Sequence, residues 1–385
     1  MTLLHLDPSF LDQRGAAHTA REIAQQPAIW QAVHDGVQRD RPALDAFLAP
    51  LLALPDLRIV LTGAGSSAFI GQCLAPALLQ LLGQRPGIRV EAIATTDIVS
   101  NPAQCLQPEV PTLLVSFGRS GNSPESLAAV ELADRLVRRS HHLIVTCAAE
   151  GALNSRMHKQ PHAHVLLLPA ETHDRAFAMT SSFTGMLLAA AWAFGLPLPS
   201  AAELGKAAQG LLDSQAQRLT TLAAQPIERF VFLGSNALQG LAREAALKML
   251  ELTDGKCVAM ADSSLGFRHG PKTILNTRTQ VVMFLSNDPY TRQYDLDLLR
   301  ELRREGRAPV LALGTAHLEG ADIVLALSTS ASDIALAPVA LVFGQCLALL
   351  ASLQLGITPD NPSASGTVTR VVSGVTIHPL STSQE

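Results

Sequence analysis

The chain repeats its order of apolar, strand-like segments after roughly 160–170 residues, and this repeat limits the folds open to it. Residues 58–63 read RIVLTG, and their counterpart at 229–234 reads RFVFLG. Three further pairs follow in the same order: 113–116 with 281–286, 142–147 with 308–313, and 165–168 with 323–327. Strands that alternate with helices form parallel sheets with helices on both faces. The sequence therefore predicts an α/β protein of two tandem domains, each a doubly wound three-layer α/β/α sandwich with a mainly parallel sheet.

Local signals divide the chain further. Each half ends in a long uncharged helix, and prolines after Gly195 indicate a linker before a helix at about 203–223. Residues 19–22 fit a capping box that starts a short helix, and Pro27 ends that helix or begins the next one. We expect four parts: an N-terminal helical segment at 1–50, a first domain at 51–200, a second domain at 201–357, and a C-terminal tail at 358–385.

Composition excludes several classes of protein. The net charge of −4 provides no basic field, so neither nucleic acid nor an anionic membrane is an expected partner. The five cysteines are scattered without a C-x-x-C pair, which indicates a reducing cytoplasm without disulfides or a zinc cluster. No signal-peptide pattern is present at the N-terminus. Residues 334–357 are uncharged and long enough to span a bilayer, but Pro338, Gln345 and the lack of flanking basic clusters favour a core or dimer-interface helix.

Residues 114–126 read LVSFGRSGNSPES, an apolar strand followed by a hydroxyl-rich loop and a helix. Ser123 is suited to the N-cap and Pro124 to the first helical position. Backbone N–H groups, the hydroxyls of Ser120 and Ser123, and the positive end of the helix together can bind phosphate. An ordinary strand-to-helix turn is the alternative. The P-loop pattern is absent.

A second glycine- and serine-rich loop, GAGSS, follows the strand at 58–62. It resembles the start of a dinucleotide-binding fingerprint. However, the third glycine is misplaced, and no acidic residue follows a second strand at the usual distance. A nicotinamide cofactor is therefore not expected.

Few side chains have a pattern suited to catalysis. Glu244, Lys248 and Glu251 share one face of a helix, which by itself is typical of a solvated edge with a Glu–Lys pair. His269 stands alone, and a lone histidine is usually structural. His158, His162 and His164 suggest a metal site, but Pro161 breaks the helix that would aim the first two rings together, so no metal is expected.

Together the two loops resemble those of the sugar isomerase (SIS) family. Residues 179–184, MTSSFT, resemble its third serine/threonine-rich turn, and 248–252 followed by 266–271 resemble the isomerase segment of glucosamine-6-phosphate synthase. The tail at 359–362 and 370–379 is more similar still to the AgaS-like subgroup. That subgroup is described as galactosamine-6-phosphate deaminase/isomerases or tagatose-6-phosphate ketose/aldose isomerases. The resemblance covers nearly the whole chain.

The resemblance implies roles for individual residues. Glu251 would move a proton between C2 and C1 of the open-chain sugar, and Lys248 would lie beside the open-chain oxygen. His269 would open the ring and would come from the neighbouring subunit, which implies a homodimer with shared active sites. The tail would be an ordered flap over the sugar, and no metal or other cofactor is implied. The phosphate and the sugar would bind Gly65, Ser67, Gly118, Arg119, Ser120, Ser123, Thr180 and Ser181, with Arg268 as a further contact.

The chain departs from the synthase at several positions. The synthase has serine and glutamine where this chain has Gly118 and Arg119, so a hydroxyl is lost while a guanidinium able to grip phosphate is gained. A lysine near the end of the synthase falls at Ser373, and its role is not carried over; Arg370 is the nearest cation. The chain also begins Met1-Thr2-Leu3, without the glutaminase domain and its N-terminal cysteine. Without an ammonia supply, such a core would run as a deaminase or as a plain isomerase.

The sequence therefore predicts an enzyme that converts galactosamine 6-phosphate to tagatose 6-phosphate and ammonia. A glucosamine-6-phosphate deaminase and a simple phosphosugar ketose/aldose isomerase remain alternatives. A non-catalytic phosphosugar-binding regulator is the third, less favoured because no basic helix-turn-helix segment is present.

Overall fold

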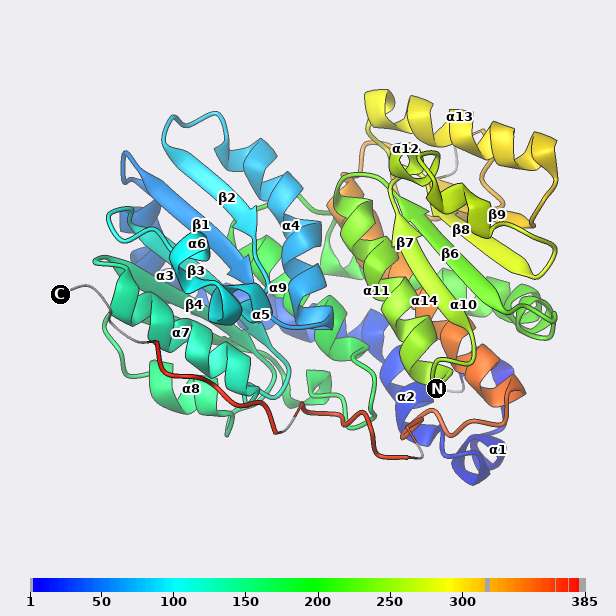
Figure 1. Ribbon diagram of the computed structural model, residues 1–385, viewed down its shortest axis with the longest axis horizontal. Helices are drawn as coiled ribbons and strands as arrows, with labels where there is room; N and C mark the ends of the chain where they lie inside the picture. The colour runs from blue at the N-terminus through cyan, green and yellow to red at the C-terminus, as the bar shows by residue number, and fades with distance from the viewer. Residues whose placement is uncertain (1–2, 316–318, 364, 373, 381–385) are drawn as a thin grey trace.

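The computed structural model describes residues 3–315, 319–363, 365–372 and 374–380. These residues form two five-stranded sheets with the orders β2-β1-β3-β4-β5 and β10-β9-β8-β6-β7 (Figure 1). The first sheet contains β1 (Leu57–Thr62), β2 (Ile88–Ala92), β3 (Thr112–Gly118), β4 (Ser140–Thr146) and β5 (Ala163–Leu167). The second contains β6 (Arg229–Gly234), β7 (Val258–Asp262), β8 (Thr279–Phe284), β9 (Val310–Thr315) and β10 (Ile323–Leu325).

Both sheets have the same topology. In each, the first strand pairs with the second on one side and the third on the other, and every pairing is parallel. The predicted repeat and the two doubly wound domains are thus confirmed. The predicted pairs omitted β2 and β7, which lie at the edges of the sheets. These strands read IRVEA and VAMAD and are mostly half-buried, so they lack the continuous apolar run that identified the inner strands.

Helices cover both sheets. In the first half they are α1 (Pro8–Gln13), α2 (Ala17–Ala24), α3 (Gln26–Leu52), α4 (Ser66–Leu82), α5 (Thr95–Ser100), α6 (Pro102–Cys105), α7 (Pro124–Leu136), α8 (Ala152–Met157) and α9 (Ser181–Ala193). In the second half they are α10 (Ala201–Ala223), α11 (Ala237–Leu252), α12 (Ser264–Phe267), α13 (Pro289–Glu305) and α14 (Asp333–Gln354). Short 3-10 turns are η1 (Leu3–His5), η2 (Ala170–Thr172) and η3 (Pro271–Ile274).

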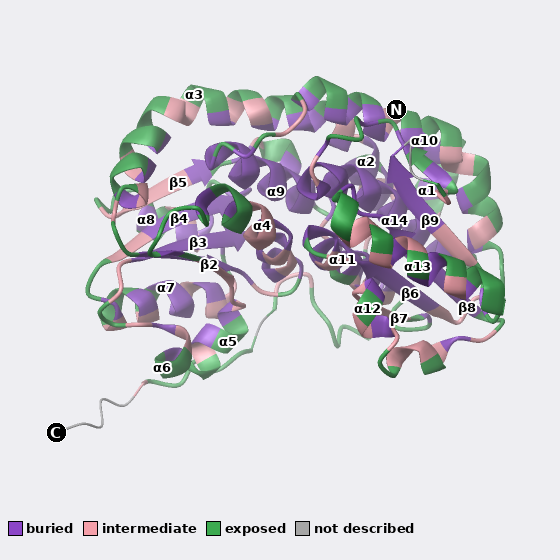
Figure 2. Cartoon of the chain, turned by 90° about the horizontal axis from the view of Figure 1, so that it is seen from above, coloured by how far each residue is buried: buried purple, intermediate pink, exposed green. Residues whose placement is uncertain are grey.

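Helix α14 corresponds to the uncharged segment that had the length of a membrane span. Among the described residues it is the one helix long and apolar enough for a bilayer, and its whole apolar window is buried within the fold. It packs against α10 and α11, in accordance with the prediction of a core helix (Figure 2). Its uniform apolar surface is explained by this all-round packing.

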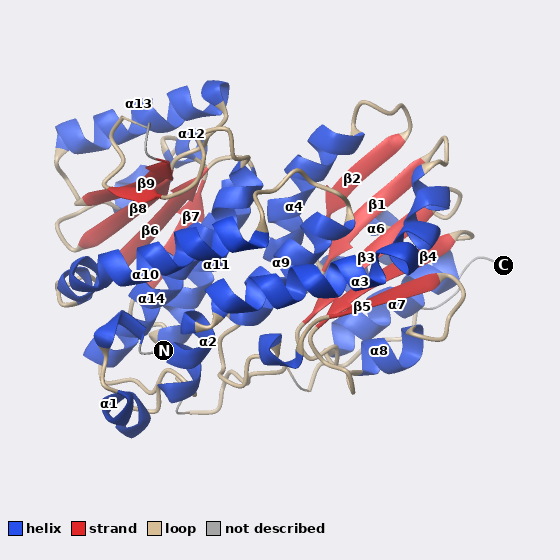
Figure 3. Ribbon diagram, turned by 180° about the vertical axis from the view of Figure 1, so that it is seen from behind, coloured by secondary structure: helices blue, strands red, loops and turns tan. Residues whose placement is uncertain are grey.

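The two halves pack closely through helices. Helices α4 and α11, one from each half, lie side by side between the two sheets (Figures 1 and 3), and α3 packs on both α9 and α10. The contact between α4 and α11 depends on Gly240. A Cβ atom at this position would lie 2.7 Å from both the N and the Sγ of Cys73. The backbones of the two helices therefore approach too closely for any larger residue.

The N-terminal region differs from its prediction in one respect. Helix α2 begins at Ala17, two residues before the expected N-cap, so the capping box is wrong. Thr19 instead donates its hydroxyl to Asp360 Oδ1 at 2.7 Å, and Glu22 accepts a bond from the backbone N–H of Arg175 at 2.6 Å. Pro27 lies in the first turn of α3, in accordance with the prediction that it begins a helix.

Candidate active site

Parallel sheets of this kind bind ligands at the carboxyl ends of the strands where the strand order reverses. In the first sheet this point lies between β1 and β3. A cavity of about 210 Å³ is present there, next to the loops that follow these two strands. It is lined by residues 64–67, 117–121, 123, 126, 177, 179, 251 and 368–372.

The loop after β3 has the form predicted for a phosphate site. Ser123 is the N-cap of α7, its Oγ accepts a bond from the N–H of Ser126 at 3.3 Å, and Pro124 is the first helical residue. Gly121 has φ +63°, a conformation that glycine adopts without strain. The hydroxyls of Ser120 and Ser123 both line the cavity at the positive end of α7. The predicted cap is confirmed.

The loop after β1 completes the same wall. Gly65 has φ +56°, and a Cβ atom on Gly63 would lie 2.5 Å from the Cβ of Ser67, so both glycines are required by the turn. Gly65 and Ser67 both line the cavity. Ser66, which the sequence did not single out, accepts a bond from Lys248 Nζ at 2.9 Å. This bond links the first half of the chain to α11 of the second half.

The Glu244–Lys248–Glu251 face of α11 is buried, so the expectation of a solvated edge is wrong. Glu244 and Lys248 have no exposed side-chain surface, and Lys248 Nζ lies 3.3 Å from Glu244 Oε1. Lys248 Nζ also donates to the carboxylate of Glu251. Glu251 keeps 22% of its side chain exposed and lines the cavity. The three residues do share one face of α11, as predicted, but this face contacts the other half of the molecule instead of solvent.

Burial sets the charges of this cluster. It raises the pKa of Glu244 to about 8, an effect that the nearby Lys248 ammonium reduces. Burial acts to lower the pKa of Lys248, but the carboxylates of Glu244 and Glu251 outweigh it and the pKa is raised. Lys248 is therefore an ammonium group, and its bond to Glu251 holds that carboxylate toward the cavity.

Arg119 lies at the cavity, but its guanidinium has backbone partners. Its Nη1 donates to the carbonyl oxygen of Phe177 at 2.9 Å, and its Nη2 donates to that of Arg370 at 2.7 Å. Arg370 in turn donates through Nε to the carbonyl of Ala176 at 3.1 Å and through Nη2 to that of Asp174. These bonds hold residues 368–372 of the tail, which line the cavity. They belong to the orange-red piece of chain between the grey residues 364 and 373 (Figure 1).

Two predicted residues of the third turn are not brought to the cavity. The Oγ1 of Thr180 donates to Asp174 Oδ1 at 3.0 Å, and the Oγ of Ser181 donates to the carbonyl of Glu22 at 2.6 Å. Asp174 also accepts bonds from the N–H groups of residues 180, 181 and 182, so an internal carboxylate occupies the N-terminus of α9. The sequence analysis did not single out Asp174, which lies seven residues before the start of α9 at Ser181.

His269 and Arg268 also lie away from the cavity. Arg268 forms an ion pair with Glu301, with Nη2 2.8 Å from Oε2. His269 is exposed in the turn between α12 and η3, and neither residue is among those that line the cavity. Ser373 lies outside the described residues. One chain thus brings together Gly65, Ser67, Arg119, Ser120, Ser123 and Glu251, with Lys248 directly behind Glu251.

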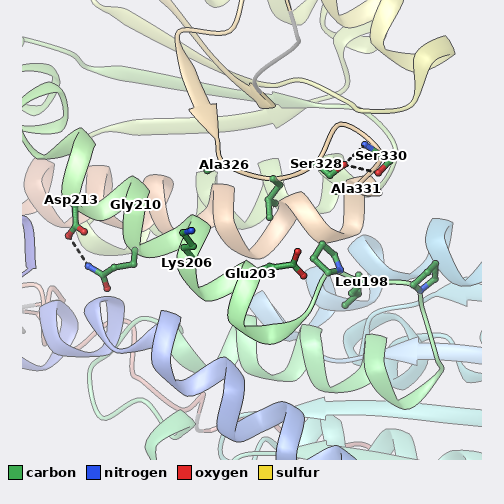
Figure 4. A pocket seen from close by; sticks show the side chains of 13 residues that line it. Leu198, Glu203, Lys206, Gly210, Asp213, Ala326, Ser328, Ser330 and Ala331 are labelled. Carbon is green, nitrogen blue, oxygen red and sulfur yellow. Dashed lines mark hydrogen bonds between the residues drawn. The ribbon is translucent and has the colours of Figure 1, made fainter.

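A larger cavity of about 940 Å³ lies beside α10, lined in part by Glu203, Lys206 and Asp213 (Figure 4). It contains none of the predicted site residues. Cavity size alone would therefore favour the larger cavity, whereas strand order and loop chemistry favour the smaller one.

Comparison with known proteins agrees with this geometry. The SIS domain model matches residues 52–195. The AgaS protein of Streptomyces coelicolor is 52% identical over 95% of this chain and 96% of its own length. The D-galactosamine-6-phosphate deaminase AgaS of a Shewanella species is 45% identical over 98% of this chain and 96% of its own.

The chain belongs to the AgaS family of SIS-domain proteins.

A solved member of similar structure is the tagatose-6-phosphate ketose/aldose isomerase from Escherichia coli, with a TM-score of 0.86 and 44% identity. The match covers 94% of this chain and 96% of that one. The AgaS relatives are named as deaminases and the solved structure as an isomerase, so this AgaS family member is an enzyme of that group.

Proposed function

We propose that the protein is an amino-sugar-phosphate deaminase/isomerase that converts galactosamine 6-phosphate and water to tagatose 6-phosphate and ammonia. The observation that carries this proposal is the Glu251 carboxylate, which is bonded to the buried Lys248 ammonium and faces the cavity of the two hydroxyl-rich loops. A carboxylate poised over the sugar and an anion site for its phosphate are the two groups this reaction needs.

The proposed reaction begins with the phosphate on the loops that carry Ser67, Ser120 and Ser123. Once the ring is open, Glu251 takes the proton from C2 and returns it to C1. Because the C1 oxygen gains a proton and the C2 amine loses one in the same change, C1 becomes a hydroxymethyl group and the C2–N bond becomes a ketimine. Water adds to this ketimine and ammonia leaves, which yields the ketose phosphate. Lys248 stabilises the negative charge that develops on the open-chain oxygen.

We further propose that ring opening is done by His269 of a second copy of the chain. His269 is exposed and remote from the cavity of its own chain. Histidine is the side chain used most often for acid–base catalysis near neutral pH. The working enzyme would then be a homodimer with shared active sites, and a cytoplasmic location suits its phosphorylated substrate.

The test is ammonia release by the purified protein from galactosamine 6-phosphate and glucosamine 6-phosphate side by side. We expect release from the galacto sugar and a loss of at least about 1,000-fold in kcat for Glu251→Gln, because the amide cannot accept the C2 proton as the carboxylate does. Glu131→Gln, an exposed position on α7, is the matched control and should keep wild-type activity. Full activity in Glu251→Gln would contradict the proposal.

A plain ketose/aldose isomerase is the second candidate, favoured by the name of the solved Escherichia coli relative. It requires the same proton transfer but no C–N cleavage. Interconversion of tagatose 6-phosphate and galactose 6-phosphate without ammonia release from either amino sugar would identify it. Preferential release from glucosamine 6-phosphate would instead assign the gluco epimer.

A further inference from the structure

Three metal-binding side chains meet at the opposite end of the first sheet from the catalytic cavity. Asp134 lies near the end of α7, His142 near the start of β4, and His162 just before β5. One donor atom from each lies within 4.8 Å of the other two. His142 is four residues before the end of its strand, so the cluster is ~13 Å from the catalytic end of the sheet.

Two of the three distances between donor atoms are close to those of a tetrahedral metal site. His162 Nε2 lies 3.4 Å from Asp134 Oδ1, and His142 Nε2 lies 2.7 Å from the same oxygen. Ligands about 2.0–2.1 Å from a zinc ion at tetrahedral angles are separated by roughly 3.3–3.4 Å. The His162–Asp134 pair already has this spacing, and the His142–Asp134 pair reaches it when the shared proton leaves and the two atoms move apart by ~0.6 Å. The donor atoms of the two histidines lie within 4.8 Å of each other.

The backbone holds the two histidines in place. The N–H of His142 donates to the carbonyl of His162 at 3.0 Å, as part of the junction between β4 and β5. Ser140 donates its hydroxyl to Asp134 Oδ1 at 2.6 Å and so orients the carboxylate from behind. Asp134 and His162 are 38% and 33% exposed, so an ion and a water ligand can reach the site from solvent.

We propose that Asp134, His142 and His162 form a binding site for a divalent transition metal, best suited to Zn²⁺, with the fourth position open to water. Two imidazoles and one carboxylate are a ligand set that zinc accepts readily. The ion would fasten the end of α7 to β4 and to the segment before β5. Its effect would be on the stability of the first sheet, because the cluster has no contact with the catalytic cavity.

The test uses the full-length protein after treatment with a chelator, titrated with Zn²⁺ alone. We expect one equivalent to bind, and the unfolding temperature to rise by ~2–5 °C at saturating zinc. His162→Gln should weaken this binding more than about 100-fold and abolish the rise in unfolding temperature. His162 is partly exposed, so its replacement leaves the fold intact.

His158→Gln is the matched control. His158 is exposed on the same segment, and its Nδ1 lies 2.9 Å from the carbonyl oxygen of Asn154. It should bind zinc as the wild type does. Absence of stoichiometric binding in the wild type, or equal binding by His162→Gln, would overturn the proposal and leave the cluster as a hydrogen-bonded His–Asp pair. Loss of binding only in Asp134→Asn, with His162→Gln unaffected, would also overturn the three-ligand site.

Discussion

Glu244 is buried, and burial makes its ionised form costly, so its protonation affects the free energy of unfolding. Its folded pKa of about 8 exceeds the ordinary value of 4.5, so between these pH values the folded state holds a proton that the unfolded state has lost. The stabilisation that this bound proton gives the folded state is complete below pH 4.5 and is lost as the pH rises toward 8.

Replacement of Glu244 by glutamine removes that dependence. We expect the free energy of unfolding of Glu244→Gln, relative to wild type, to increase by up to about 1.4 kcal/mol per pH unit between pH 5 and 7.5. Denaturant titrations at several pH values measure it, with Glu131→Gln as the exposed control that should show no such trend. A difference that is flat with pH would show that Glu244 is ionised in the folded protein.

Arg119 connects the loop of the cavity to the tail through Nη bonds to the carbonyls of Phe177 and Arg370. Hydrogen bonds from a charged donor each contribute ~1.5–3 kcal/mol. We expect Arg119→Lys, which cannot span both carbonyls, to raise KM about tenfold or more and to speed tryptic cleavage after Arg370. Arg135→Lys, at an exposed contact with the carbonyl of Leu380, should change neither quantity. Unaltered cleavage in Arg119→Lys would show that the tail is held by other groups.

At the scale of elements, the contact between α4 and α11 leaves no room beside Gly240. We expect Gly240→Ala to lower the free energy of unfolding by about 1–3 kcal/mol, because a Cβ atom would overlap the backbone and side chain of Cys73. Gly210→Ala in α10 is the control: nothing lies within 4 Å of its Cβ position, so alanine there should stabilise by roughly 0.5–1 kcal/mol. Thermal unfolding of the two variants distinguishes them, and equal effects would contradict the close packing.

The crevice of the second sheet differs in charge from that of the first. A cavity of about 550 Å³ lies at the equivalent point, and Asn236 there has φ +56°, the same value as Gly65. However, Asp288 and Asp333 line it alongside its serine and threonine residues. Asp333 accepts bonds from Ser286 Oγ and from the N–H of Asn287, at 2.6 and 2.7 Å. Carboxylates at this point repel a phosphate group.

The whole molecule offers a direct test of the shared site. Glu251→Gln and His269→Asn should each be inactive alone. Mixed dimers of the two variants contain one complete site, so a 1:1 mixture that exchanges subunits freely should recover about one quarter of the wild-type activity. Ammonia release before and after subunit exchange measures this. Persistent inactivity of the mixture would show that both residues act within one chain, whereas full activity of His269→Asn alone would show that His269 has no part in the reaction.

Much of this architecture was predictable from sequence because apolar strands and capped helix starts are local signals. Strands β1, β3, β4 and β5, their counterparts in the second half, and the Ser123 cap are examples. The burial of Lys248 was not predictable from the helix itself, because it depends on α4, which lies about 180 residues earlier in the chain. The same holds for Thr180 and Ser181, whose hydroxyl groups bond to Asp174 and to the carbonyl of Glu22 rather than line the cavity. The burial and the hydrogen bonds of these side chains depend on segments that are distant in the sequence.

The hydrogen bond between Ser66 and Lys248 joins the two halves of the chain at the cavity. The two halves are copies of one structural unit, yet they have divided the work between them. In the proposed mechanism, one copy provides the anion-binding loops, while the other, whose own crevice is lined by Asp288 and Asp333, provides the Glu251 carboxylate of α11. Neither copy alone would then be a catalyst. The alignment of α4 with α11 therefore matters to the proposed site as much as the residues that line the cavity do.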